Sequence, residues 1–364
     1  MISAQQTDKV SRKTQLSIIA TALVGFSGIL SETSMNVTFT KLMTIFHLPL
    51  SSLQWITTVY LLAVAISMTL SATLQQNVKE RLQFTIAVLL FLLGTVTCII
   101  SAHFGLMIIG RALQGAGTGI AMPLMFNLII ERIPINKIGT YMGIGGLIMS
   151  LAPAFGPTYG GFMIAHFSWQ WIFLLTLPVP VIALIISYFS LENSPKTSKR
   201  PFDFISFLLL AIALSFFLIL ISGLESGSLN WLALIIFGFA LIFFVFRSLK
   251  LQTPFLDIRI LKQAPVLLGL IPSNLASNFV IPNFLVQAEH ISTTIAGFVL
   301  LPGTLLGGIL APFFGKLYDL KGPKLSLYWG NTLFAVSLGI FALWINSLTI
   351  MLMILVYIIF TFGR

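Results

Sequence analysis

Long apolar stretches joined by short polar connections recur along the whole of this sequence. A membrane-spanning helix needs about 20 consecutive apolar residues, because the hydrocarbon core of a bilayer is about 30 Å thick. Charged residues make up only 8% of the 364 residues, whereas soluble domains carry about 25%. We therefore predict an all-α fold, a polytopic transmembrane helical bundle. The twelve expected spans cover approximately residues 16–45, 52–75, 82–102, 105–131, 138–165, 170–190, 204–223, 230–247, 264–287, 293–315, 325–345 and 348–364.

The two longest polar connections divide this bundle into three parts. They bracket a pair of spans that is rich in Leu, Ile and Phe and poor in Gly. We expect an N-terminal six-helix half in 1–190, two inserted helices with their loops in 191–263, and an incomplete C-terminal half of about four helices in 264–364. Repeated six-helix units are typical of transporters. This symmetry predicts that about two and a half helices of the second half are missing after Arg364.

Basic residues indicate the orientation of the bundle. With the N-terminus inside, the inner connections hold nearly all of the Lys and Arg, and the outer side holds almost only Lys41. Cytoplasmic loops of membrane proteins carry such an excess. The sequence therefore predicts a multi-pass protein of the plasma (cell) membrane with a cytoplasmic N-terminus. The same rule accounts for the net charge of +10 without a nucleic-acid partner.

Two ionisable residues, Glu32 and Arg111, fall inside expected spans. A charge within the bilayer costs at least about 2.5 kcal/mol, so such residues are functional candidates. Counting 1.5 Å per residue along each helix places both in the outer half of the membrane. We expect them to form a proton-coupling pair or to share a water-filled cavity. The alternative is a static structural ion pair.

Four further residues are candidates for the wall of a substrate cavity. Asn36 lies one helical turn after Glu32, and Gln114 lies three residues after Arg111. Met122 and Phe126 continue along the same span and would provide an adaptable apolar surface. Ordinary packing is the alternative for the last two.

The span 138–165 carries an unusual density of Gly and Pro. Gly156 and Gly160 are four residues apart, which lets another helix approach closely, and Gly161 follows directly. Pro153 and Pro157 lie nearly on the same face, and each removes one backbone hydrogen bond. We expect a bent, closely packed helix with a hinge-like role.

The remaining chemistry-bearing residues do not form a reaction centre. The four histidines are scattered, and Cys98 is the single cysteine. The Gly-rich stretch 143–146 lies within a span and not between a strand and a helix, so it is no nucleotide fingerprint. We expect no catalytic residues, no metal site, no cofactor and no enzymatic activity.

Several stretches together resemble the fourteen-helix drug:proton antiporters (EmrB/QacA-like) of the major facilitator superfamily. Residues 152–161 (APAFGPTYGG) resemble the family's antiporter motif, with Ala where Gly is usual. Residues 111–115 (RALQG) resemble the fourth-helix motif with its proton-coupling arginine, and 32–37 (ETSMNV) resemble the acidic first-helix motif. The resemblance implies the major facilitator fold with two inserted central helices, of which about twelve of fourteen helices are present.

The resemblance also implies a conformational gate loop in the second half, made of Gly315, Asp319 and Gly322. The equivalent stretch of the first half, 71–81 (SATLQQNVKER), lacks the Gly and the Asp. Its basic end, Lys79 and Arg81, remains. How the first-half gate is held is therefore left open by the sequence.

The function expected from these features is proton-driven efflux of amphipathic drugs or other small molecules by a bacterial secondary transporter. Glu32 would carry the proton and Arg111 would be its electrostatic partner. The expected partners are the lipid bilayer, the small-molecule substrate and protons, and we expect a monomer. Two alternatives remain: a nutrient proton symporter, and a non-transporting truncated remnant or membrane interaction subunit.

Overall fold

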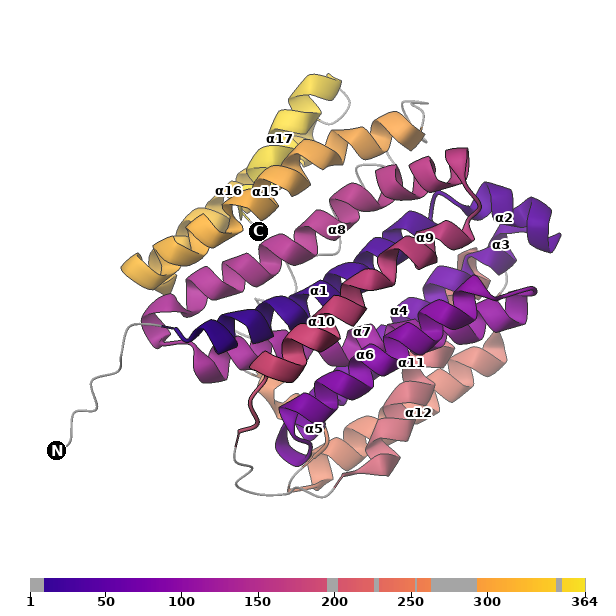
Figure 1. The fold of residues 1–364 in the computed structure, drawn as a ribbon, viewed down its shortest axis with the longest axis horizontal. Coiled ribbons are helices and arrows are strands. Elements are labelled where there is room, and N and C mark those ends of the chain that lie inside the picture. Colours follow the sequence, from indigo (N-terminus) through magenta and orange to yellow (C-terminus); the bar gives the residue numbers. More distant parts are fainter. Residues whose placement is uncertain are drawn as a thin grey trace. The chain divides into compact units, whose positions relative to one another are not determined.

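The computed structural model describes residues 10–194, 202–225, 229–252, 254–262, 293–344 and 349–363. Within these ranges every regular element is helical, which confirms the all-α prediction (Figure 1). The first half of the chain contains α1 (Arg12–Met35), α2 (Phe39–Phe46), α3 (Leu50–Leu53), α4 (Trp55–Thr69), α5 (Ser71–Asn77), α6 (Glu80–Ile99), α7 (Phe104–Arg132), η1 (Ile135–Lys137) and α8 (Ile138–His166). The remainder contains α9 (Gln170–Thr176), α10 (Pro178–Ser190), α11 (Phe204–Glu225), α12 (Trp231–Lys250), η2 (Ile258–Lys262), α15 (Thr293–Lys321), α16 (Pro323–Trp344) and α17 (Ile350–Gly363).

Eight helical stretches in the described part are long and apolar enough to cross a membrane. They correspond to the first eight predicted spans. The ninth predicted span, 264–287, lies outside the described residues. The last three predicted spans fall on α15, α16 and α17.

Two predicted spans are not continuous helices. The first ends at Met35, and a turn over 36–38 separates it from α2. The second is divided at Leu70 between α4 and α5. At the first break the Thr38 side chain accepts no backbone N–H and instead donates its hydroxyl to the Met35 carbonyl at 2.7 Å. The same Met35 carbonyl also accepts the Thr38 backbone N–H at 2.9 Å, so Thr38 satisfies the end of α1 twice.

The described chain forms two compact units. One contains the described residues of 11–128 and 156–260, and the other contains the described residues of 129–155 and 261–363. Helix α8 contributes to both, and the boundary falls between Phe155 and Gly156. These units are defined by packing, so the domain limits at 190 and 263 stay predictions.

In the first unit α1 packs along α10, and α6 packs against α9 and α10. One of its apolar clusters joins the end of α1 to α2, α3, α9 and the neighbouring parts of α4, α6, α7 and α8. Its buried members are Met35, Leu42, Leu53, Ile56, Cys98, Met107, Met163, Trp169, Ile172 and Phe173. This cluster closes the end of the unit at which the Glu32 carboxyl lies.

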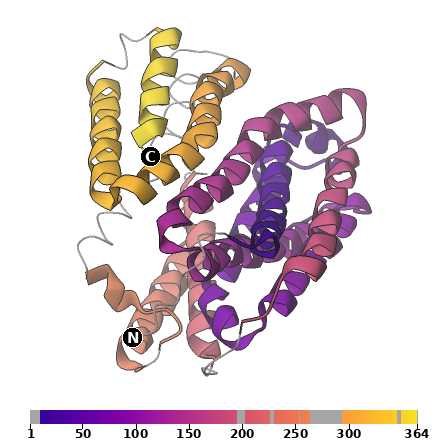
Figure 2. The same cartoon turned by 60° about the vertical axis from the view of Figure 1, so that its left-hand side comes forward.

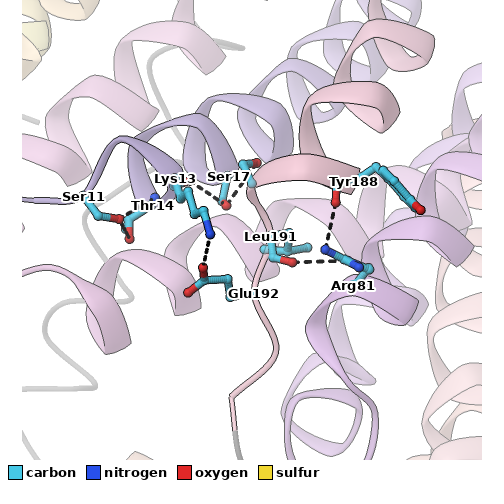
Figure 3. A network of polar contacts seen from close by, with 9 residues as sticks. Ser11, Lys13, Thr14, Ser17, Arg81, Tyr188, Leu191 and Glu192 are labelled. Carbon is cyan, nitrogen blue, oxygen red and sulfur yellow. Dashed lines mark hydrogen bonds and ion pairs between the residues drawn. The ribbon is translucent and has the colours of Figure 1, made fainter.

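Polar contacts hold the opposite end of the same unit (Figure 3). The Arg81 guanidinium donates to the carbonyls of Tyr188 at 2.8 Å and Leu191 at 3.3 Å, where α10 ends. The last carbonyls of a helix have no partner within it, so a basic side chain there stabilises the helix end. Lys13 pairs with Glu192 at 2.7 Å in the same region. Arg81, one of the two basic residues left in the first-half gate stretch, therefore caps α10.

Helices α11 and α12 form a hairpin and lie side by side in both views (Figures 1 and 2). An ion pair joins their ends, with Arg247 Nη2 3.0 Å from Asp203 Oδ1. The Asp203 carboxylate also accepts from the backbone N–H of Ser206 at 3.2 Å, which caps the start of α11. One carboxylate thus ties α11 to α12.

In the second unit α15, α16 and α17 pack together, as the orange and yellow helices of Figure 2 show. Their buried apolar residues are Val299, Phe341, Met353, Val356, Tyr357 and Phe360. Gly303 of α15 meets the Tyr357 ring of α17, so no larger residue fits there. The start of α8 lies against α15 and completes the described unit.

Candidate functional site

Arg111 on α7 is completely buried. Its Nη1 donates to Ser31 Oγ of α1 at 3.0 Å and to Gln114 Oε1 at 2.8 Å, and its Nε donates to the Ile56 carbonyl of α4 at 3.3 Å. A buried charge is tolerated only where such partners replace its hydration. The guanidinium therefore ties three helices together. Its remaining nitrogen, Nη2, has no hydrogen-bond partner among the described residues.

The Tyr60 ring of α4 covers the guanidinium. The Arg111 Cζ lies 4.2 Å from the ring centroid, within the range of a cation–π interaction. Tyr60 itself is buried, and its hydroxyl lies 3.2 Å from Thr118 Oγ1 of α7. The Thr118 hydroxyl donates to the Gln114 carbonyl at 2.9 Å. Tyr60 is thus held by two contacts, its ring by the Arg111 guanidinium and its hydroxyl by Thr118.

Gln114 connects the arginine to α6. Its Oε1 accepts from Arg111, while its Nε2 donates to Thr95 Oγ1 at 2.9 Å. The Cys98 thiol is 3.8 Å from the same Oε1. Since both ends of the amide are engaged, its orientation is fixed, with the oxygen toward Arg111.

Glu32 lies in the last turn of α1, three residues before its end at Met35. It is half-buried, shares a side-chain hydrogen bond with Asn36 and interacts electrostatically with Arg111. No ion pair joins Glu32 to Arg111 in the described structure. The alternative interpretation, a static ion pair with Glu32, is therefore not what holds the arginine.

Asn36 caps the end of α1 and is exposed. Its Oδ1 accepts from the Thr57 hydroxyl of α4 at 3.2 Å. The amide links the candidate proton carrier to the helix that also supplies Tyr60. Met122 and Phe126 lie further along α7, both half-buried. At 100° per residue, Met122 is on the same side of α7 as Arg111, and Phe126 is close to that side.

The two spaced glycines of the Gly/Pro stretch contact α1. Gly156 lies against Thr33, and the Ser34 hydroxyl donates to the Gly156 carbonyl at 3.0 Å. A Cβ on Gly160 would lie only 2.5 Å from the Ser34 carbonyl. The structure therefore brings this glycine face against the turn of α1 that follows Glu32.

The other three members of the stretch lie differently. Pro153, Pro157 and Gly161 are exposed, and nothing lies within 4 Å of a Cβ added at Gly161. The expectation that the prolines share the close-packed face is thus not what the structure shows, because the buried side of α8 is formed by small residues. Its members here are Ala152, Gly156 and Gly160, which lie within 80° of one another at 100° per residue.

The expected gate residues meet the start of α8 within the second unit. Asp319 Oδ1 accepts from the Gly139 N–H at 2.6 Å, and Oδ2 accepts from the N–H and hydroxyl of Thr140 at 2.8 and 2.7 Å. A carboxylate at a helix N-terminus satisfies free N–H groups and the helix dipole. Gly315 contacts Gly139 backbone to backbone, and Gly322 ends α15 at φ +77°, a conformation that favours Gly.

Sequence reasoning missed four members of the arginine network: Ser31, Tyr60, Thr95 and Thr118. Uncharged hydroxyls are common in apolar spans, so nothing singles these residues out. The only available signal was helical spacing, since Thr118 lies seven residues after Arg111 and on the same face. The described residues contain no group of His, Cys, Asp and Glu that could hold a metal ion.

The fold and this site define a helical membrane protein of the transporter class. Residues 21–207 match the family model of the Major Facilitator Superfamily. The lincomycin resistance protein LmrB of Listeria monocytogenes is 33% identical over 320 residues, which cover 84% of this chain and 68% of that protein. The LmrB of Bacillus subtilis is 32% identical over 337 residues, which cover 89% and 70%. The chain belongs to the Major Facilitator Superfamily.

A solved structure supports the same fold. The proton:xylose symporter XylE, bound to 6-bromo-6-deoxy-D-glucose, superposes with a TM-score of 0.61 at 16% sequence identity. The match covers 98% of this chain and 80% of the XylE chain. At this identity the likeness concerns the fold alone.

Proposed function

We propose that this protein is a secondary transporter that exports amphipathic or cationic small molecules in exchange for protons. The observation that carries the proposal is the free, fully buried Nη2 of Arg111 in electrostatic reach of Glu32. A donor left unpaired in the membrane costs several kcal/mol. An acceptor that becomes available in another state of the cycle would recover that energy, and a deprotonated Glu32 is such an acceptor.

The proton step follows from this geometry. While Glu32 holds a proton, Nη1 and Nε of Arg111 donate to Ser31, Gln114 and the Ile56 carbonyl, and Nη2 stays unpaired. When the carboxyl releases its proton, the carboxylate attracts the free Nη2, and the arginine need not leave its other partners. The cycle thus moves one proton per carboxyl, taken up on one side of the membrane and released on the other. Asn36 would orient the carboxyl through its hydrogen bond.

The substrate class rests on the relatives and on the composition of the site. Both LmrB proteins are named for lincomycin resistance, which supports drug efflux here. Met122 and Phe126 would offer an adaptable apolar wall beyond Gln114. A half-buried carboxylate favours cationic substrates by Coulomb attraction.

The proposal extends to the whole architecture. The protein would have the architecture of the fourteen-helix antiporters, with α11 and α12 as the inserted pair. The 152–161 stretch would be its antiporter motif and Gly315, Asp319 and Gly322 its gate loop. It would be a monomer in a bacterial plasma membrane, with the N-terminus in the cytoplasm.

The test is transport in inverted membrane vesicles with an imposed proton gradient. Wild-type vesicles should accumulate ethidium or lincomycin when the lumen is acidic. Glu32→Gln should abolish this accumulation, because the amide cannot release a proton. Glu192→Gln is the matched control, since this exposed carboxyl pairs with Lys13 at the far end of α1, and it should transport normally.

Unchanged accumulation by Glu32→Gln would exclude the proton-carrier role. Movement of substrate together with protons, out of the vesicle lumen, would favour the symporter instead. Folded wild-type protein that moves none of a broad drug panel would favour a non-transporting role.

A further inference from the structure

The segment that follows α12 is hydrogen-bonded to the last turn of that helix. Ser248 Oγ donates to the Leu256 carbonyl at 2.5 Å. The Arg259 Nη2 donates to the carbonyls of Leu249 at 2.6 Å and Leu251 at 3.0 Å, which are the free carbonyls of the last turn. The described residues of the stretch 251–260 are therefore folded back onto the last turn of α12.

An aromatic contact fixes the same segment to the start of α11. The buried Phe255 ring lies 5.7 Å from Phe202 and 5.8 Å from Phe207, both in edge-to-face geometry. Asp203, between these two phenylalanines, holds Arg247 of α12. The segment is thus attached to both helices of the hairpin.

These attachments set the depth of the segment in the membrane. Trp231–Lys250 is long and apolar enough to span the bilayer, so its last turn lies at a membrane surface. A segment bonded to that turn lies at the same level, in the interface between headgroups and acyl chains.

The side chains that the segment leaves uncovered suit this position. Leu249, Leu256 and Ile260 are 44%, 40% and 51% exposed. Large apolar side chains exposed to this degree on a tethered, interfacial segment are stabilised by burial among acyl chains.

Basic side chains accompany these apolar ones. Lys250 and Arg259 are exposed, and the Lys250 Nζ lies 5.9 Å from the centroid of the Phe246 ring. The lysine stem therefore runs along the apolar helix face with its ammonium at the helix end. Asp257 accepts from the Arg259 backbone N–H at 3.1 Å, and Arg247 is neutralised by Asp203. The segment carries two cations, Lys250 and Arg259, against the single carboxylate of Asp257, so its net charge is positive.

We propose that Leu249 and Lys250, the last two residues of α12, and the described residues of 251–260 together form an interfacial anchor that binds anionic phospholipid headgroups at the membrane surface where α12 ends. The phosphate of the lipid meets Lys250 and the exposed part of Arg259, and the acyl chains cover Leu256 and Ile260. A soluble protein partner is disfavoured, because it would have to displace the lipid that surrounds the helix end. The proposal stands apart from the transport function and from the Arg111 network.

The test uses a fluorescent probe in the full chain. Cys98→Ser removes the only cysteine, and Leu256→Cys then allows specific attachment of a bimane fluorophore. The labelled protein is placed in phosphatidylcholine vesicles that contain phosphatidylglycerol, with brominated acyl chains on one lipid or the other at equal mole fraction. The anchor predicts quenching by both, and clearly stronger quenching when bromine is on phosphatidylglycerol.

Substitution of the basic side chain identifies the source of the selectivity. Lys250→Gln should reduce the preference for phosphatidylglycerol by about fivefold, the contribution of one basic residue near an anionic surface. Lys79→Gln removes an exposed lysine elsewhere and should leave the preference unchanged. A second probe at Ile260→Cys covers the case in which the label at 256 disturbs folding.

Two results would overturn the proposal. One is a probe that shows water-like emission and is not quenched in any of the vesicles. This result includes the case in which the probe becomes shielded from water only after cytosolic protein is added. The other is equal quenching by the two brominated lipids, which would leave an apolar contact without headgroup recognition.

Discussion

Arg111 is confined on every side but one. Ser31, Ile56 and Gln114 engage its donors, and Tyr60 covers its plane. Such an arrangement fixes the position of a charge while leaving one donor, Nη2, for a changing partner. Tyr60 is therefore a positioning residue, which acts on the proton step through the guanidinium.

Two substitutions at Tyr60 separate the ring from the hydroxyl. Tyr60→Leu removes a desolvated cation–π contact of about 2 kcal/mol, and we expect at least a tenfold loss of transport with a displaced pH profile. Tyr60→Phe keeps the ring and loses only the contact with Thr118. It should keep the wild-type pH profile and cost about 1 kcal/mol of stability. Identical pH profiles for the two variants would contradict a positioning role.

For single residues, the sequence predicts the buried charged side chains better than the uncharged side chains that contact them. Glu32 and Arg111 stand out because ionisable groups are rare in apolar spans, and Gln114 follows from its spacing. Ser31, Tyr60 and Thr95 do not stand out, since each becomes a partner only when α1, α4 and α6 meet α7. Whether Glu32 and Arg111 act in proton transfer stays a prediction.

The contact of α8 with α1 depends on two glycines of α8, which have no side chain to keep the helices apart. Gly156 and Gly160 let the backbone of α8 approach Thr33 and Ser34, next to Glu32. Four-residue spacing in the sequence predicts such a face, but not which helix it meets.

A matched pair of substitutions tests this contact. Gly156→Leu must push α1 away, and overpacking of this kind costs about 1–3 kcal/mol. Gly161→Leu enters open space on the same helix and should be nearly neutral. We expect Gly156→Leu to reduce transport severalfold without moving the pH midpoint. Equal transport by the two variants would indicate that the 152–161 stretch serves only ordinary helix packing.

The hairpin of α11 and α12 carries an ion pair that responds to acid. Burial raises the pKa of the Asp203 carboxyl, but hydrogen bonds from Arg247 and Ser206 outweigh this, and the pKa lies below its ordinary value. A carboxyl whose pKa is lowered in the folded state stabilises the fold at every pH above its pKa in the unfolded chain, about 3.9. This contribution is lost as the pH falls through the pKa of the folded state.

Asp203→Asn should therefore lower the stability measured by thermal unfolding in detergent at pH 7, by about 1 kcal/mol. The difference from wild type should shrink below about pH 4. The exchange Asp203→Arg with Arg247→Asp should recover part of the loss at neutral pH. A constant difference at all pH values would show that the carboxylate charge contributes nothing.

The breaks within spans were beyond sequence reasoning. The turn at 36–38 contains no Gly and no Pro, so the first apolar run reads as one helix. Hydroxyl and amide side chains there bond to the backbone and to α4, and this competition with the helix is decided by tertiary partners. By contrast Gly322, where α15 ends, is a recognisable helix stop.

For the whole molecule, the distribution of basic residues predicts one orientation. Lys79 and Ala102 flank α6 at opposite ends, and both are exposed. In the Cys98→Ser background, a membrane-impermeant maleimide applied to intact cells should label Ala102→Cys. It should label Lys79→Cys only after the cells are permeabilised. The reverse pattern would place the N-terminus outside.

The network of residues around Arg111 has a consequence for how the chain is made. Ser31, Ile56, Tyr60 and Thr95 all precede Arg111 in the sequence, and Gln114 and Thr118 lie within the next two turns of the same helix. A helix that enters the bilayer with an unaccompanied arginine costs about 2.5–3.5 kcal/mol. When α7 emerges from the ribosome, α1, α4 and α6 have already been synthesised, so acceptors for the guanidinium are at hand during insertion. In the described structure, every residue that stabilises the Arg111 guanidinium, directly or through Gln114 and Tyr60, is encoded no later than Thr118.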